Sequence, residues 1–258
     1  KVNGEVKGSD DGISVVVVED TNASLTYGKQ YKVTVTGFAK DATQVSITLR
    51  QGIVLDESGN GNKETTFILF SSLKETNTET LENSGFLGNT TIQRQNIEKI
   101  IFQNNLNGIN DTKWKASAQD DESIMAWYES RTVSGTTLYT VYIGSNVLMN
   151  ANPDSSYLFS YIGYNSNCVA TSTSNPLIEN IDLLNIGSVT NMEGMFQYFG
   201  HKTMSSLSLG TGFDTTNVTN MSNMFKQCGY RAMTTIDLGV NFNTSDVTNM
   251  SNMFNGCG

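Results

Sequence analysis

The sequence has little proline, cysteine, histidine or charge, and these shortages exclude several classes of protein. Among 258 residues, two are proline, three are cysteine and one is histidine. Three cysteines are too few for a disulfide-stabilised scaffold, and an odd number leaves at least one unpaired. The longest apolar runs are short stretches such as Val15 to Val18. A membrane-spanning helix needs about 20 apolar residues, so the sequence predicts no membrane span.

Charge is scarce as well as unbalanced. Charged residues make up 16% of the chain, and the formal net charge is −9. A negative surface repels phosphate backbones, so a nucleic-acid partner is excluded. Neutral polar residues supply the surface instead, among them 29 asparagines. This composition favours an extracellular protein over a cytosolic enzyme.

The strongest signal is an eight-residue motif that recurs at the carboxyl end. Val-Thr-Asn-Met-Ser-Asn-Met-Phe occupies residues 218–225 and 247–254, and Val-Thr-Asn-Met-Glu-Gly-Met-Phe occupies residues 189–196. Both offsets are 29 residues. A match of this length with two equal offsets indicates internal repeats. Because one repeat cannot bury both its faces, neighbouring repeats are expected to stack as a solenoid.

Each copy predicts a short strand followed by a short helix. From Val218, apolar residues fall at i, i+3, i+6, i+7 and i+10, which places them on one face of a helix. The residue before the valine, such as Asn217, is an N-cap former. Short apolar alternations at 181–183, 207–209 and 236–238 predict the strands. The predicted repeat core comprises Val189, Met192, Met195, Phe196, Val218, Met221, Met224, Phe225, Val247, Met250, Met253 and Phe254.

The two ends of the array differ. Residues 157–168 predict a degenerate copy that precedes the first repeat, as a capping unit would. Gly258 directly follows a complete motif, so the array is expected to be truncated here and to continue in a longer protein. The chain begins at Lys1 without a signal peptide, which indicates a processed product or a piece of that protein.

The repeat motif resembles the bacterial surface-protein repeats grouped with BspA-like leucine-rich repeats and the mycoplasma lipoprotein repeat family. The segments 123–128 and 152–159 are similar to the lead-in before the first repeat of such proteins. The resemblance covers roughly residues 110–258 and implies a β/α leucine-rich-repeat-like solenoid in a secreted or wall-attached protein, often an adhesin. It carries over no catalytic residues. The 29-residue period is longer than the family's usual unit.

The amino-terminal part predicts a multidomain chain. Residues 13–19, 30–37, 43–50 and 65–70 are β-rich runs separated by turn residues, which favours an immunoglobulin-like β-sandwich over residues 1–72. Residues 73–96 are polar and predict a linker. Residues 97–156 predict a β-rich cap, in which 97–102, 123–129 and 136–143 could pair as a meander around Trp114 and Trp127. The solenoid then occupies residues 157–258.

One segment could bind calcium. Alternating oxygen side chains with a glycine at the sixth place match the first half of an EF-hand loop. The bidentate glutamate is missing, however, since Phe67 stands at the twelfth place, and the same residues are ordinary in hairpin turns. A plain turn is therefore the preferred interpretation, and no other cofactor is expected. The candidate ligands are Asp56, Ser58, Asn60, Asn62 and Glu64.

Catalytic alternatives find little support. His201 is the only base that a nucleophile such as Cys168 could use, and no surrounding pattern supports the pair. A surface-loop histidine is the preferred interpretation. The acidic run 120–122 could serve a hydrolase, but a solvated turn is the preferred interpretation. The chain is therefore predicted to be no enzyme.

Equivalent residues of successive repeats should meet. Cys228 and Cys257 are expected to form a buried thiol ladder, with a disulfide as the alternative in an oxidising exterior. Asn220 and Asn249, with the threonines that precede them, are expected to form ladders between repeats.

The leading functional hypothesis is a non-enzymatic, monomeric binding or adhesion module outside the cell or on the bacterial wall. It would recognise a protein or a glycan through the repeat surface, because stacked repeats offer extended surfaces. Its signal and anchor would lie outside this fragment. A structural spacer is the alternative, and a carboxylate hydrolase is a distant third.

Overall fold

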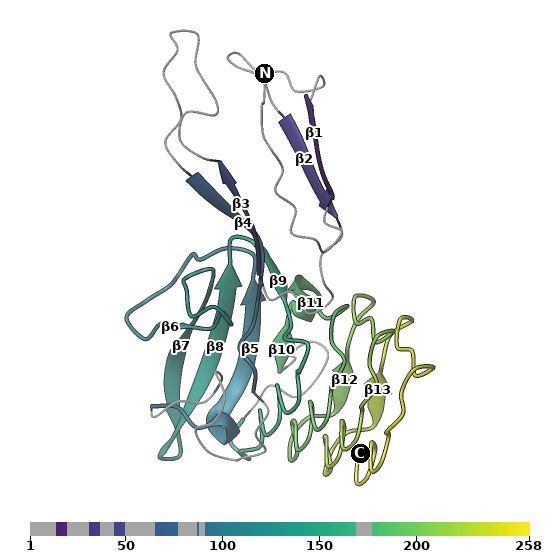
Figure 1. Ribbon diagram of the computed structural model, residues 1–258. Helices are drawn as coiled ribbons and strands as arrows, with labels where there is room; N and C mark the ends of the chain where they lie inside the picture. Colours follow the sequence, from purple (N-terminus) through teal and green to yellow (C-terminus); the bar gives the residue numbers. More distant parts are fainter. Residues whose placement is uncertain are drawn as a thin grey trace. The chain divides into compact units, whose positions relative to one another are not determined.

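The computed structural model is rich in β-strands and turns and contains almost no helix in its described residues (Figure 1). It describes residues 14–19, 31–36, 44–49, 65–76, 87, 91–168 and 177–258. The chain divides into two compact units. The first unit comprises Lys1–Ala42 and Ser46–Phe67, and the second comprises Thr43–Val45 and Ile68–Gly258. Within the described ranges the helices are two short 3-10 turns, η1 (Arg94–Asn96) and η2 (Ile181–Leu183). Neither has the length or apolar composition that crossing a bilayer requires.

Four strands form close to the positions that the amino-terminal sequence predicts. β-branched residues dominate these segments and favour extended backbone. β1 pairs with β2 in antiparallel register. The strands are β1 (Ser14–Glu19), β2 (Tyr31–Thr36), β3 (Gln44–Leu49) and β4 (Thr65–Ser72).

The predicted immunoglobulin-like sandwich is wrong. In the described part of the chain, the hydrogen-bonded neighbour of β1 is β2, whereas β4 belongs to a sheet of order β11-β9-β4-β3. The end of β4, from Phe70 to Ser72, pairs in parallel with β9 (Leu148–Asn150) and lies in the second unit. Long-range pairing of this strand overrides the local pattern of turns and short strands that suggested a closed sandwich.

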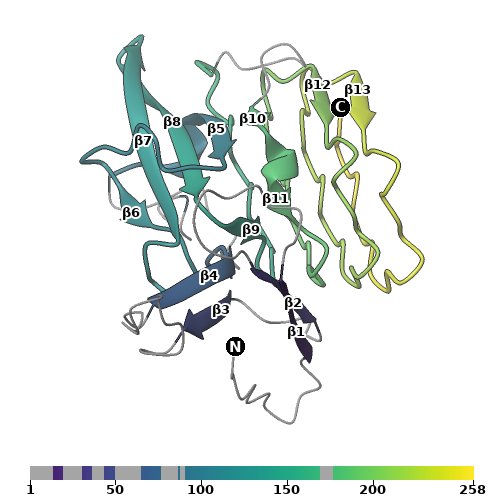
Figure 2. The same ribbon diagram turned by 90° about the horizontal axis from the view of Figure 1, so that it is seen from above.

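A five-stranded sheet forms the first part of the second unit (Figure 2). β7 and β8 form a hairpin whose two turn residues, Ser134 and Gly135, both have positive φ, as a tight hairpin turn requires. β5 pairs with β8 in parallel, so the predicted meander is wrong; a meander would make every pair antiparallel. The order is β10 (Ile178–Glu179), β5 (Ile97–Gln103), β8 (Thr136–Ser145), β7 (Ile124–Val133) and β6 (Trp114–Lys115).

The predicted β/α leucine-rich-repeat-like solenoid is also wrong, because the repeat motifs are turns rather than helices. The N–H of Met195 donates to the carbonyl of Met192, and that of Phe199 to Phe196, at 3.2 and 3.1 Å. The third residue of each turn, Gly194 and Tyr198, has φ of 57° and 56°. An α-helix does not contain positive φ, so the motif cannot continue as one.

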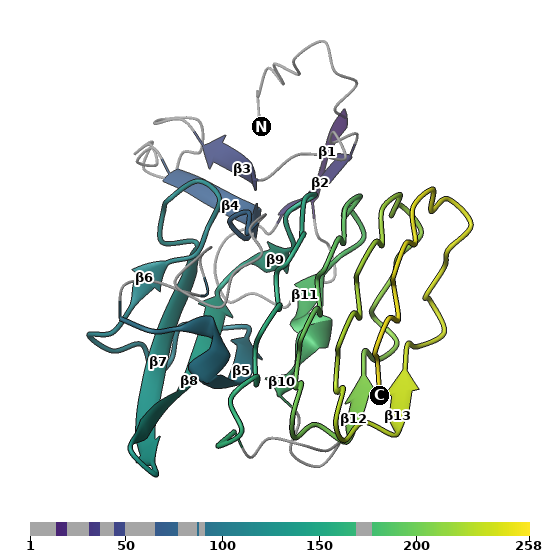
Figure 3. The same cartoon turned by 90° about the horizontal axis from the view of Figure 1, so that it is seen from below.

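Alternate N–H groups of each motif bond to the next repeat instead. Met192, Gly194 and Phe196 donate to the carbonyls of Asn220, Ser222 and Met224 at 2.8–2.9 Å. The pattern recurs 29 residues later, and residues 155–161 donate to the first repeat in the same way. Figure 3 shows the repeats following one another. Short parallel pairs lie on another side of the repeats: β9 with β11 (Leu184–Asn185), and β12 (Ser206–Ser208) with β13 (Thr235–Asp237).

The interior of the stacked repeats contains a column of phenylalanines. The ring centroids of Phe159, Phe196, Phe225 and Phe254 follow one another at 5.3, 5.5 and 5.3 Å. Every proposed core residue of the first two copies is buried, as is Met253. In the last copy Val247 is half-buried, while Met250 and Phe254 are 48% and 44% exposed.

Polar side chains join the repeats, and the threonine ladder forms as predicted. The hydroxyls of Thr219 and Thr248 donate to the carbonyl of the threonine one repeat earlier, and the Nδ2 of Asn220 donates to Asn191 Oδ1 at 3.0 Å. The Oδ1 atoms of Asn220 and Asn249 accept the backbone N–H two residues later, which stabilises the turns.

Candidate functional site

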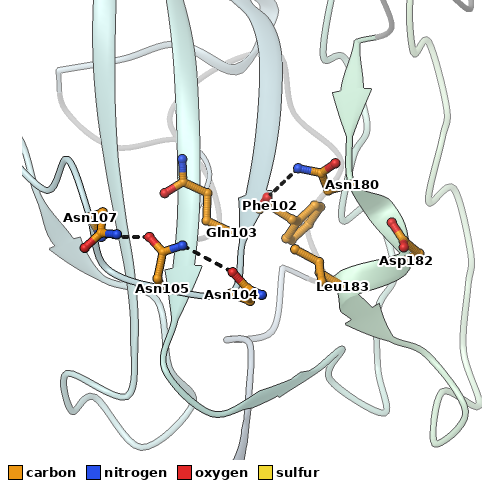
Figure 4. Close-up of a pocket in the computed structure, with 8 residues that line it drawn as sticks. All are labelled: Phe102, Gln103, Asn104, Asn105, Asn107, Asn180, Asp182 and Leu183. Atoms are coloured by element: carbon orange, nitrogen blue, oxygen red, sulfur yellow. Dashed lines mark hydrogen bonds between the residues drawn. The ribbon is translucent and has the colours of Figure 1, made fainter.

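Amide side chains line a hollow where β5 ends beside the first repeat. β5 is fully buried at Phe102, and an asparagine-rich segment follows its last residue, Gln103. η2 forms the opposite wall, and the hollow has a volume of about 480 Å³ (Figure 4). Its lining comprises Phe102, Gln103, Asn104, Asn105, Asn107, Asn180, Asp182 and Leu183.

A second hollow of about 450 Å³ adjoins the first. The two share Gln103, Asn104 and Leu183. Together they form one depression, called the amide groove below. The second hollow adds Ile68, Asn146, Val147, Leu148 and Met149 to the lining.

Asn180 positions the repeat side of the amide groove. β10 runs parallel to β5, and Asn180 follows it with φ of 57° and ψ of 39°. Asparagine tolerates this left-handed conformation better than most residues. Its Nδ2 donates to the Phe102 carbonyl at 3.1 Å, which ties the start of η2 to the end of β5.

Neighbouring amides of the groove bond to one another. The Nδ2 of Asn105 donates to Asn104 Oδ1 at 3.2 Å, and the Asn107 N–H donates to Asn105 Oδ1 at 2.9 Å. The Oε1 of Gln103 is buried and has no hydrogen-bond partner among the described residues. An unpaired buried acceptor costs about 1–3 kcal/mol, and this oxygen is closed to a ligand because it has almost no accessible surface.

The groove combines amides with one ionisable group. Among the described residues that line it, Asp182 is the one ionisable side chain. Amides offer paired donors and acceptors, which match hydroxyl and amide groups of a ligand.

A second feature is a row of aromatic rings along the repeats. His201 lies between Tyr164 and Tyr230, with centroid distances of 4.9 and 5.1 Å, and Tyr161 stacks on Tyr198 at 4.7 Å. Because the rings stack on one another, their faces are largely covered. Burial lowers the pKa of His201, and the nearby cation of Lys202 lowers it further, whereas the bond between His201 Nδ1 and the Gln227 carbonyl raises it.

The His201 stack predicts a loss of stability at mildly acidic pH. The folded-state pKa lies below the unfolded value, so the unfolded chain binds the proton more readily. Stability should therefore fall as pH drops through about 6.5 and level off below the folded pKa. Because this is the chain's only histidine, His201→Phe should flatten the change in melting temperature between pH 7.5 and 5.5. Equal slopes for the two proteins would contradict the prediction.

The other candidate sites are not brought together. The calcium ligands Asp56, Ser58, Asn60, Asn62 and Glu64 lie outside the described residues. Within the described part, no group of three or more His, Cys, Asp or Glu side chains is placed to hold a metal ion.

The proposed nucleophile and the acidic run have structural partners instead. Burial, together with the charge of Glu98, raises the pKa of Cys168 to about 12. His201 is only 8% exposed, so the interpretation as a surface-loop histidine is wrong. Asp120 pairs with Lys74 at 2.7 Å, and Asp121 Oδ1 accepts the Ser117 hydroxyl at 2.8 Å.

Cys228 and Cys257 are free thiols in adjacent repeats. Burial raises the pKa of Cys228, and a hydrogen bond from Cys228 lowers the pKa of Cys257. These interactions agree with a thiol ladder.

Sequence reasoning missed the amide groove. The asparagines at 104, 105 and 107 cluster after a predicted strand, but their partners at 180–183 lie more than seventy residues away. The cluster was the available signal, and it pointed to a loop as readily as to a site.

Among the comparisons with known proteins, one family model matches the carboxyl part of the chain. No curated protein and no solved structure matches the chain. Residues 166–258, which include the three repeats and the 180–183 wall of the amide groove, match a family described as Mycoplasma protein of unknown function, DUF285.

Proposed function

We propose that the chain is a non-enzymatic binding module of a bacterial surface protein. It engages an extracellular protein or glycan through the face where the first repeat meets the five-stranded sheet. The amide groove is the observation that carries this proposal, because the described lining of its two hollows combines exposed amide groups with a single ionisable residue. Ligand-binding sites are typically concave, with a few polar groups that fix orientation.

Three observations support a location outside the cell or on its wall. The carboxyl part matches a Mycoplasma family, and the repeat motif resembles those of bacterial surface proteins. The surface uses asparagine, serine and threonine in place of charge.

A structural spacer is the second candidate. Backbone hydrogen bonds between successive repeats, such as Met221 N–H to the Asn249 carbonyl at 2.8 Å, favour a rigid stack. A spacer, however, needs no available polar groups beside the first repeat.

An array of immobilised glycans and extracellular-matrix proteins tests the proposal. We expect the labelled chain to bind at least one component saturably, and mass spectrometry should find that component chemically unchanged. Cleavage of the component would indicate a hydrolase. Absence of binding across the array would leave the spacer as the better account.

A further inference from the structure

We infer that the amide groove is a saccharide site and that its ligand is a neutral oligosaccharide. The inference rests on the binding role proposed above and names the ligand class of that site. Four properties of the lining carry it: its hydrogen-bonding groups, its charge, its apolar surface and the pairing of its strands.

The hydrogen-bonding groups match a polyhydroxyl ligand. Asn104, Asn107 and Asn180 are exposed at the rim, and each amide carries both a donor and an acceptor. Asn180 commits its Nδ2 to Phe102, so its Oδ1 remains to accept a hydroxyl.

The charge of the groove favours a neutral ligand. Asp182 is exposed, and the part of the lining that the structure describes contains no Lys, Arg or His to neutralise an anionic group. The net charge of −9 adds a repulsive long-range field. Sialylated or sulfated sugars should therefore bind less well than their neutral counterparts.

Apolar surface lies beside the amides. Leu148 is 55% exposed, and Leu183 is half-buried between the two hollows. The C–H face of a sugar ring can pack on such side chains while its hydroxyls bond to the amides. Two adjoining hollows, each within the usual size of a ligand pocket, fit more than one sugar unit.

The pairing of the strands disfavours an extended peptide as the ligand. β5 lies between β10 and β8, and β9 lies between β11 and β4. A peptide that adds to a sheet needs a strand with a free edge, and the strands that line the groove have neighbours on both sides.

The experiment compares matched asparagine variants by calorimetry and on the array. The probes are neutral hexose and N-acetylhexosamine oligosaccharides together with sialylated and sulfated versions of each. Asn104→Ala/Asn107→Ala removes two exposed groove amides, whereas Asn255→Ala removes one exposed amide from the surface of the third repeat. Tryptophan fluorescence verifies that each variant is folded.

We expect a neutral oligosaccharide to bind the wild type, and the double variant to raise its Kd about tenfold or more because two hydrogen bonds are lost. Asn255→Ala should leave the Kd unchanged. Binding confined to anionic sugars, or binding of any component that survives in the double variant, would overturn the saccharide inference while the binding role stands. Absence of all protein and glycan binding would remove the proposed function itself.

Discussion

Replacing Arg94 with methionine is expected to lower the free energy of unfolding of the second unit by about 3–5 kcal/mol. The side chain is fully buried within the protein. Its guanidinium donates to the carbonyls of Tyr157, Leu158 and Ser160 at 2.6, 2.8 and 3.1 Å. Methionine fills much of the same volume but offers no donor, so three carbonyls would each lose a charged donor, although that of Tyr157 also accepts from the N–H and hydroxyl of Ser160.

The charge of Arg94 does not remove this expectation. Burial lowers its pKa to about 9, and the group therefore remains protonated at neutral pH. The hydrogen bonds to the three carbonyls compensate the charge, and they connect η1 to residues 157–160 of the degenerate copy that precedes the first repeat. Arg94→Lys should fall between wild type and Arg94→Met, because a compact ammonium cannot reproduce the fork of donors.

Urea unfolding followed by tryptophan fluorescence measures this effect. The only tryptophans, Trp114 and Trp127, both lie in the second unit, so the signal reports on that unit. Arg231→Met makes the same change at an exposed position and should shift stability by less than about 0.5 kcal/mol. Equal losses in the two variants would show that the Arg94 bonds do not stabilise the fold.

Local sequence predicts the strands well because their signal is local. The β-branched runs at 14–19, 31–36 and 44–49 form strands within a residue of the expected bounds. The 29-residue period likewise predicts which residues meet between repeats, since equal spacing brings equivalent positions together. The asparagine and threonine ladders follow from that spacing alone.

The helix prediction fails because a ribbon of turns buries residues at the same spacing. Val218, Met221, Met224 and Phe225 are all fully buried, as one helix face would be. The distinguishing signal is instead the residue that must adopt positive φ, which is Gly194, Asn223 or Asn252 in the three motifs. Glycine and asparagine at equivalent places of every copy favour turns.

The sheet partners and the amide groove depend on contacts that no local pattern encodes. β5 and β10 are separated by more than seventy residues, and only their pairing places Asn180 beside Phe102. Arg94 illustrates the same limit, because a polar segment read as a linker contributes a fully buried side chain. Each site is assembled by the fold rather than by a motif.

Replacing Gly239 with alanine is expected to destabilise the stacked repeats by about 3 kcal/mol, whereas Gly210→Ala should cost about 1 kcal/mol. The two glycines follow β13 and β12 at equivalent places, with φ of 80° and 72°, so alanine strains the backbone similarly at both. A Cβ on Gly239 would lie 2.1 Å from the Gly210 carbonyl oxygen, whereas one on Gly210 would meet nothing within 4 Å. Only Gly239→Ala must push neighbouring repeats apart.

Hydrogen exchange at the Leu209 amide measures the difference between the destabilisations expected for Gly239→Ala and Gly210→Ala. Its N–H donates to the Asp237 carbonyl at 2.9 Å, directly beside the contact between Gly239 and Gly210. In Gly239→Ala this amide should exchange at least tenfold faster than in Gly210→Ala, since each 1.4 kcal/mol of opening free energy corresponds to a factor of ten. Equal exchange in the two variants would mean that the repeats accommodate the added methyl group, and that the close approach at Gly239 does not hold β12 and β13 in register.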